Sequence, residues 1–171
     1  MQKRKKVKFK VGSKLIEGGR VYNVYKIKKE KVLEKTQRII HYRPFYMNCR
    51  NDDIDCSIPE SNLDQTDMRE PVTKKEIRKI LRSLSVKSGE RKRINPPEAK
   101  TSLYLNDIHK TFDVIKSYWG EKKQNGSEFT KVKKDILGSG TDRAVEEVAY
   151  IIGISLDNAK QKIIKALESK A

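Results

Sequence analysis

The spacing of apolar residues changes once along this chain, near Pro71. Before it, apolar residues alternate with polar ones, as in Val21 to Ile27, which is typical of β-strands. After it, they recur every three or four positions, as in Ile77 to Leu84, which is typical of helices. A chain of 171 residues is long enough for two small domains, and the change of period favours two over one. The sequence therefore predicts an α+β protein with a flexible basic arm over residues 1–8, a β domain over 9–70 and an all-α domain over 71–171.

Basic residues outnumber acidic residues in both halves of the chain. There are 39 Lys and Arg against 23 Asp and Glu, a formal net charge of +16, and such an excess attracts polyanions. Residues 1–72 hold 17 basic and 10 acidic residues, and residues 73–171 hold 22 and 13. The positive charge is therefore shared, and composition alone leaves the identity of the polyanion open.

The β domain is predicted from short apolar runs separated by turn residues. Two runs flank Gly18-Gly19, a third covers Ile39 to Cys49 and is rich in β-branched and aromatic side chains, and a last one covers Ile54 to Ile58. Four to five short strands in about 60 residues predict a small β-barrel that closes on itself.

The first helices of the α domain are predicted from their caps and apolar stripes. Thr73 and Glu76 form a capping box, and Asn95 precedes two prolines suited to a first helical turn. A third helix is predicted from one apolar stripe, which also places Trp119 in the core. That stripe consists of Ile108, Phe112, Ile115 and Trp119.

Glycines mark the expected ends of the later helices. Gly138-Ser139-Gly140 is expected to end a short helix that begins at Phe129, and Thr141 is expected to cap the next one. Gly153 then gives a left-handed helix end, and Ser155 caps a last helix through Leu167. The sequence thus predicts a bundle of about five helices.

No residue pattern matches a catalytic, metal or cofactor site. His41 and His109 are far apart in the sequence, and Cys49 and Cys56 lack the paired spacing of a zinc finger or ribbon. A nucleophile elbow and the Gly-Lys-Ser/Thr ending of a phosphate loop are both absent from the sequence. We therefore expect a binding protein and not an enzyme, with no metal, no cofactor and two reduced thiols.

A cluster of basic residues marks a predicted loop and the helix that follows it. These candidate DNA-binding residues are Lys87, Arg91, Lys92, Arg93 and Lys100. Such a cluster binds phosphates without reading bases, so its affinity falls steeply with salt. An ordinary solvated loop is the alternative interpretation, because lysine-rich proteins expose such runs by default.

The segment from Val145 to Leu167 has the residue spacing of a helix-turn-helix, with a small residue at Ala149 and a turn at Gly153. Asp157 would repel phosphate where a recognition helix usually enters the groove. Two packed helices of a bundle are the preferred interpretation, because any helical hairpin with a glycine turn has this spacing. A freestanding nucleic-acid-binding protein is the alternative function.

Five segments stand in an order and spacing similar to those of a known family. They are Phe9-Lys10-Val11-Gly12, Ile54 to Asn62, Met68-Arg69-Glu70-Pro71, Asn106 to Ile115 and Val145 to Leu167. Over about residues 9 to 169 the chain resembles the CarD/CdnL family of bacterial RNA-polymerase-binding transcription regulators, whose N-terminal domain is shared with transcription-repair coupling factor. The resemblance implies a Tudor/SH3-like barrel on the RNA polymerase β subunit and a helical domain on promoter DNA, which together modulate open-complex stability.

The resemblance also implies residues that contact the polymerase. Those positions hold Glu30, Val32 and Ser57. Glu30 reverses a charge of the family pattern and Ser57 removes one, so we expect compensating changes in the polymerase or a contact shifted toward Arg50 or Lys28.

The segment matched to the family's DNA wedge, Glu90 to Asn95, contains no aromatic residue. Promoter contact is therefore expected to be nonspecific and to rest on phosphate attraction. Because the sequence has no membrane-length apolar stretch and no signal-peptide core, we expect a cytoplasmic monomer that joins the nucleoid through RNA polymerase.

Overall fold

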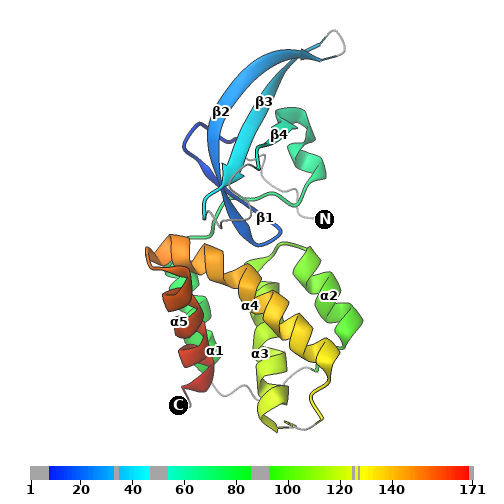
Figure 1. Ribbon diagram of the computed structural model, residues 1–171, viewed down its shortest axis with the longest axis vertical. Helices are drawn as coiled ribbons and strands as arrows, with labels where there is room; N and C mark the ends of the chain where they lie inside the picture. Colours follow the sequence, from blue (N-terminus) through cyan, green and yellow to red (C-terminus); the bar gives the residue numbers. More distant parts are fainter. Residues whose placement is uncertain are drawn as a thin grey trace. The chain divides into compact units, whose positions relative to one another are not determined.

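The computed structural model describes residues 8–32, 35–46, 54–85, 93–124, 126 and 128–169. It divides the chain into two compact units, unit 1 over Met1–Pro71 and unit 2 over Val72–Ala171 (Figure 1). In the described ranges, unit 1 holds a four-stranded antiparallel sheet and unit 2 holds five α-helices, which confirms the predicted α+β class. The division falls at the change of hydrophobic period.

The sheet of unit 1 has the strand order β1-β2-β3-β4. Its strands are β1 Lys14–Glu17, β2 Arg20–Val32, β3 Lys35–Pro44 and β4 Cys56–Pro59. Gly18 and Gly19, with φ of 56° and 82°, make the tight β1–β2 turn, in which side chains other than glycine are strained. Figure 1 shows β2 and β3 as a long curved hairpin, and their register shifts between Val24 and Lys26, which leaves Tyr25 as an extra residue.

The described part of the sheet is open, so the closed barrel predicted from the sequence is not seen there. The outer edge of β1 is paired with Arg69 and not with β4. The Ile16 amide donates to the Arg69 carbonyl at 2.8 Å, and the Arg69 amide donates back at 3.1 Å. A segment that follows the last strand therefore satisfies the edge that barrel closure would otherwise use.

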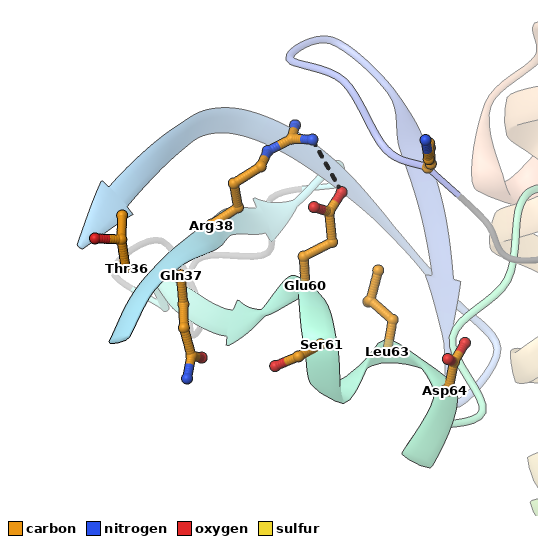
Figure 2. A pocket seen from close by; sticks show the side chains of 8 residues that line it. Thr36, Gln37, Arg38, Glu60, Ser61, Leu63 and Asp64 are labelled. Carbon is orange, nitrogen blue, oxygen red and sulfur yellow. Dashed lines mark ion pairs between the residues drawn. The ribbon is translucent and has the colours of Figure 1, made fainter. Parts of the chain in front are cut away.

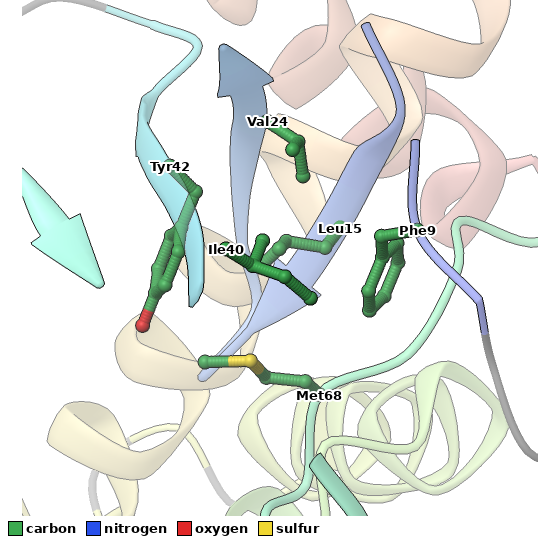
Figure 3. Packing of buried hydrophobic residues seen from close by; sticks show 6 residues of the cluster. All are labelled: Phe9, Leu15, Val24, Ile40, Tyr42 and Met68. Atoms are coloured by element: carbon green, nitrogen blue, oxygen red, sulfur yellow. The ribbon is translucent and has the colours of Figure 1, made fainter. Parts of the chain in front are cut away.

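One face of the sheet carries the core of unit 1 (Figure 3). The buried cluster consists of Phe9, Leu15, Val24, Ile40, Tyr42 and Met68. The 3-10 helix η1, Glu60–Gln65, contributes Leu63 to its edge. Because successive strand residues point to opposite faces, the neighbours of these core residues form the other face of the sheet.

The helices that the structure describes in unit 2 are α1 Lys74–Ser85, α2 Pro96–Tyr104, α3 Ile108–Gln124, α4 Lys131–Ile152 and α5 Leu156–Glu168. Three of them, α1, α2 and α5, begin where their caps predict. Side-chain oxygens of Thr73, Asn95 and Ser155 accept the amides of Glu76, Glu98 and Asn158 at 3.2, 2.9 and 3.2 Å. Gly153 ends α4 with φ 79°, as predicted.

The predicted helix break at Gly138-Ser139-Gly140 is wrong, because α4 runs through it without interruption. Thr141 does not cap a new helix, and its hydroxyl donates to the Leu137 carbonyl at 2.8 Å within α4. A Cβ at Gly140 would lie 3.3 Å from Ile115 Cγ1 and 3.5 Å from Leu103 Cδ2. The glycine therefore permits the close approach of α4 to its neighbours and does not end the helix.

The apolar stripe of α3 is confirmed at Ile108, Phe112 and Ile115, which are buried. Trp119 is partly buried, with its indole Nε1 shielded from solvent, so its predicted core position is met only in part. The ammonium groups of Lys122 and Lys123 lie 5.4 and 5.9 Å from the centre of its ring. The neighbouring residue, Tyr118, is the fully buried aromatic residue of this helical turn.

Unit 2 also buries a carboxylate. Glu147 of α4 has no exposed surface, and its Oε1 accepts the amide of Val72 at 3.0 Å. The first residue of unit 2 is thereby held to the C-terminal part of α4. None of the helices in the described ranges has the length and apolarity to cross a membrane.

Candidate functional site

His41 connects two of the residues predicted to contact the polymerase. Glu30 on β2 and Ser57 on β4 are both exposed. The Glu30 carboxylate lies 3.8 Å from His41 Nε2, and Ser57 is the register partner of His41 on β3. Val32 is at the end of β2, opposite Lys35, and Arg50 is outside the described residues.

The face of the sheet opposite the core carries cations and aromatic rings. We call it the sheet face and define it by Lys14, Asn23, Tyr25, Lys26, Lys28, Glu30, His41, Arg43, Phe45 and Ser57. Its charge is mainly positive. This surface is not predictable from the sequence, because its members come from four strands and from Phe45 just after β3, and they adjoin only after the strands pair.

Direct contacts link the aromatic and basic residues of the sheet face. The Lys14 ammonium donates to Asn23 Oδ1 at 2.9 Å and lies 5.1 Å from the centre of the Phe45 ring. The Arg43 guanidinium lies 5.3 Å from the centre of the Tyr25 ring, and the His41 ring is 6.2 Å from Tyr25. Both Phe45, which is exposed, and Tyr25, which is partly buried, are therefore accompanied by a cation.

Two further features of the sheet face are electrostatic. A hydrogen bond to the Lys28 amine, together with repulsion between the two charges, lowers the pKa of Lys26. Desolvation and the neighbouring Asp55 carboxylate, which accepts a hydrogen bond from the phenol, raise the pKa of Tyr25. The surface thus holds two crowded ammonium groups beside a phenol that stays neutral at physiological pH.

The structure describes two of the five predicted DNA-binding residues. Arg93 and Lys100 are exposed. Arg93 lies two positions before the Asn95 cap, and Lys100 lies on α2 next to the buried Ala99. Lys87, Arg91 and Lys92 lie outside the described residues. Their proximity to one another in space is therefore untested.

A second basic surface, on α1, was missed. We call it the α1 stripe and define it by the exposed residues Lys75, Arg78, Lys79 and Arg82. The helix buries its apolar side, which includes Ile77 and Leu81, and its one acid, Glu76, lies 2.7 Å from His109 Nε2. The period that predicts the apolar side also places these cations together, so the stripe was present in the sequence pattern.

The α4–α5 pair has the predicted turn, with Gly153 at the end of α4 and Ser155 as the cap of α5. The α5 helix exposes three lysines, Lys160, Lys162 and Lys165. Asp157 is also exposed in its first turn, so the end expected to enter a groove carries a negative charge.

A cavity of about 450 Å³ lies between β3 and η1 in unit 1 (Figure 2). Its walls carry both signs of charge, and Arg38 and Glu60 form an ion pair across it at 3.2 Å between Nη1 and Oε1. In the described part of the chain, no three His, Cys, Asp or Glu side chains are grouped as a metal site would require. Neither feature favours a particular ligand.

Comparison with known sequences finds no protein-family model and no curated protein that matches this chain.

Proposed function

We propose that this protein is a non-catalytic transcription regulator similar to the CarD/CdnL family. Unit 1, as a Tudor-like domain, binds the RNA polymerase β subunit, and unit 2 contacts promoter DNA. The observation that carries the proposal is the presence of two compact units, each with its own exposed cationic surface. A protein built in this way links two macromolecules and needs no chemistry of its own.

The docking site for polymerase in unit 1 is the part of the sheet around His41. Glu30, His41 and Ser57 place a carboxylate, an imidazole and a hydroxyl side by side on neighbouring strands. Such a set of mixed polar groups suits the rim of a protein interface. The Ile16 backbone at the β1 edge is already hydrogen-bonded to Arg69, so in this proposal the polymerase binds the face of β2, β3 and β4 and does not add a strand at β1.

The DNA contact of unit 2 is the α1 stripe together with the basic residues that follow α1 in the sequence. The stripe has its cations at helical spacing along one exposed side, and Arg93 and Lys100 are exposed near and on α2. Cations without base-reading groups bind the phosphate backbone and give a steep salt dependence. We therefore assign to unit 2 a contact that is nonspecific in sequence.

The regulatory effect follows from linkage. A ligand that binds the open promoter complex more tightly than the closed one shifts the equilibrium by the ratio of its two affinities. Holding unit 2 on DNA through a polymerase-bound unit 1 also raises the local concentration of the α1 stripe at the promoter.

The test is capture of RNA polymerase from a nuclease-treated lysate of the native cell by the tagged full-length protein. The wild-type chain should retain the β subunit, and Glu30→Lys should retain clearly less. The control is Lys31→Glu, which also changes one charge sign on β2 but on the other side of the strand. Absence of polymerase from the wild-type capture contradicts the proposal.

The α5 lysines favour one second candidate, a freestanding nucleic-acid-binding protein that uses the α4–α5 pair as a reader. It predicts sequence-selective duplex binding without polymerase, which changing Lys160, Lys162 and Lys165 to Ala abolishes. Binding without sequence preference and without loss in this variant contradicts it.

A further inference from the structure

We infer that the sheet face of unit 1 binds single-stranded nucleic acid. Unpaired bases stack on Tyr25 and Phe45, and backbone phosphates bind Lys14, Lys26, Lys28 and Arg43. This inference goes beyond the proposed function, which gives unit 1 a protein partner, and it is argued from the surface of the sheet alone.

The first line of evidence is the presentation of the two rings. Phe45 is 41 % exposed, and its ring meets that of Tyr46 edge-on at 5.0 Å. Tyr25 lies beside Arg43, whose guanidinium carbon is 5.3 Å from the ring centre, and beside the His41 ring, and its hydroxyl bonds to Asp55. Rings fixed in this way lose little conformational freedom when a base stacks on them, so more of the stacking energy appears as affinity.

The second line of evidence is the position of the cations around these rings. Lys14 lies beside Phe45, and Arg43 lies beside Tyr25 at distances that allow cation–π contact. A planar guanidinium also stacks on bases, so Arg43 extends the surface that Tyr25 offers. Each stacking position therefore has a positive group within reach of the phosphate that accompanies a bound base.

The third line of evidence is the crowding of Lys26 and Lys28. Two ammonium groups this close on an exposed strand repel one another, and an anion bound between them removes that repulsion. Two acids, Glu30 and Asp55, also act on Lys26, but the surface holds four cations, Lys14, Lys26, Lys28 and Arg43. Its net charge is therefore positive.

The combination of rings and cations selects the class of ligand. The bases of a duplex are stacked on one another, so a duplex would contact the cations but not the rings of Tyr25 and Phe45. A single strand exposes the faces of its bases, which can stack on both rings. An acidic peptide matches the charge but has no planar group for the rings. The α1 stripe, which has cations and no aromatic residue, lacks this selectivity.

The test measures binding of the full-length protein to a fluorescein-labelled oligothymidine of about 12 nucleotides by fluorescence anisotropy in 0.2 M salt. Tyr25→Ala should weaken binding roughly five- to a hundredfold, the usual range for loss of one base-stacking ring, while Tyr25→Phe should bind like the wild type. Phe45→Ala, at an exposed position where folding is not at risk, should weaken binding over the same range.

The matched control lies on the same strand. Lys26→Ala with Lys28→Ala removes two charges from the sheet face, and Lys29→Ala with Lys31→Ala removes two exposed charges from the other side of β2. The first pair should weaken binding several-fold more than the second.

Three results overturn the inference: wild-type affinity in both Tyr25→Ala and Phe45→Ala, equal losses in the two lysine pairs, or displacement of the oligothymidine by polyglutamate as readily as by unlabelled oligothymidine. Polymerase capture is a separate readout, so failure of either proposal is distinguishable from failure of the other.

Discussion

The sheet face of unit 1 and the α1 stripe of unit 2 are both cationic, but only the sheet face has aromatic rings among its charges. The stripe lies on one helix, whose repeat places cations three and four residues apart on an exposed side. The sheet face gathers residues from several strands, so rings and charges distant in sequence become neighbours. We therefore propose different binding modes for the two surfaces, phosphate attraction on the helix and base stacking combined with phosphate attraction on the sheet.

The two units also differ in what holds them together. Unit 1 depends on strand pairs and on a chain segment at Arg69 that completes the β1 edge. Unit 2 has an apolar core between its helices, and local caps and the contacts of α4 at Gly140 and Glu147 add to it. Local signals such as caps can be recognised in a sequence, but contacts between distant segments cannot. This is the main reason that the helix starts of unit 2 were predicted better than the closure of the sheet in unit 1.

The largest expected effect separates the two surfaces. Changing Arg78, Lys79 and Arg82 to Ala should lower duplex affinity at least tenfold at low salt and reduce the slope of log K against log salt by up to about 2.7, since each lost phosphate contact removes about 0.9. Loss of oligothymidine binding should be much smaller. The measurement is a salt titration with each probe.

The control for that experiment is the triple change of Lys160, Lys162 and Lys165 to Ala on α5, which removes the same charge from unit 2. An equal fall in slope for both triple variants would mean that net charge, and not the α1 stripe, governs duplex binding.

The next effect tests the tertiary anchor of unit 2. Glu147→Ala should lower the free energy of unfolding of this unit by about 2–3 kcal/mol, because it removes a buried acceptor and leaves the Val72 amide without it. Glu147→Gln, which keeps an oxygen at that position, should cost less. The chain has one Trp, Trp119 of unit 2, so tryptophan fluorescence during denaturation reports on this unit. Equal losses in the two variants would exclude the hydrogen bond as the cause.

A pair of glycines in α4 gives effects of opposite sign. Gly140→Leu should destabilise unit 2 by about 1–3 kcal/mol, because its side chain meets Ile115 and Leu103. Gly138→Ala has no atom within 4 Å of the new Cβ and should stabilise the helix by about 0.5–1 kcal/mol. Both are measured by denaturant unfolding, and a loss of stability in Gly138→Ala would mean that α4 is interrupted there after all.

The smallest effect concerns pH and unit 1. Desolvation raises the pKa of Glu17 above its ordinary value, with a hydrogen bond from Tyr42 as a smaller opposing influence. A carboxyl whose pKa is raised in the folded state binds more protons folded than unfolded, so its contribution to stability falls as pH rises from about 4.5 through the folded pKa. Glu17→Gln should therefore gain stability relative to the wild type between pH 4.5 and pH 7. Thermal unfolding of both proteins at the two pH values checks the sign, and a constant difference between them contradicts the assignment.

Several features were predictable because their causes are local. The caps at Thr73, Asn95 and Ser155 and the left-handed end at Gly153 were each predicted from a few neighbouring residues, and each is present. The error at Gly138-Ser139-Gly140 has a nonlocal cause. Glycines often end helices, but Gly140 packs against Ile115 and Leu103, which lie on two other helices.

The sequence by itself determined that strands come first and helices second, where most helices begin and end, and that both halves are basic. These follow from side-chain period, cap chemistry and composition, which act over a few residues. Only the tertiary structure decided that Gly140 is a contact point inside one helix, that Glu147 holds Val72, and that Tyr25, Arg43 and His41 adjoin on one face. Each of these depends on which distant segments pair, and pairing is set by the packing of the whole unit.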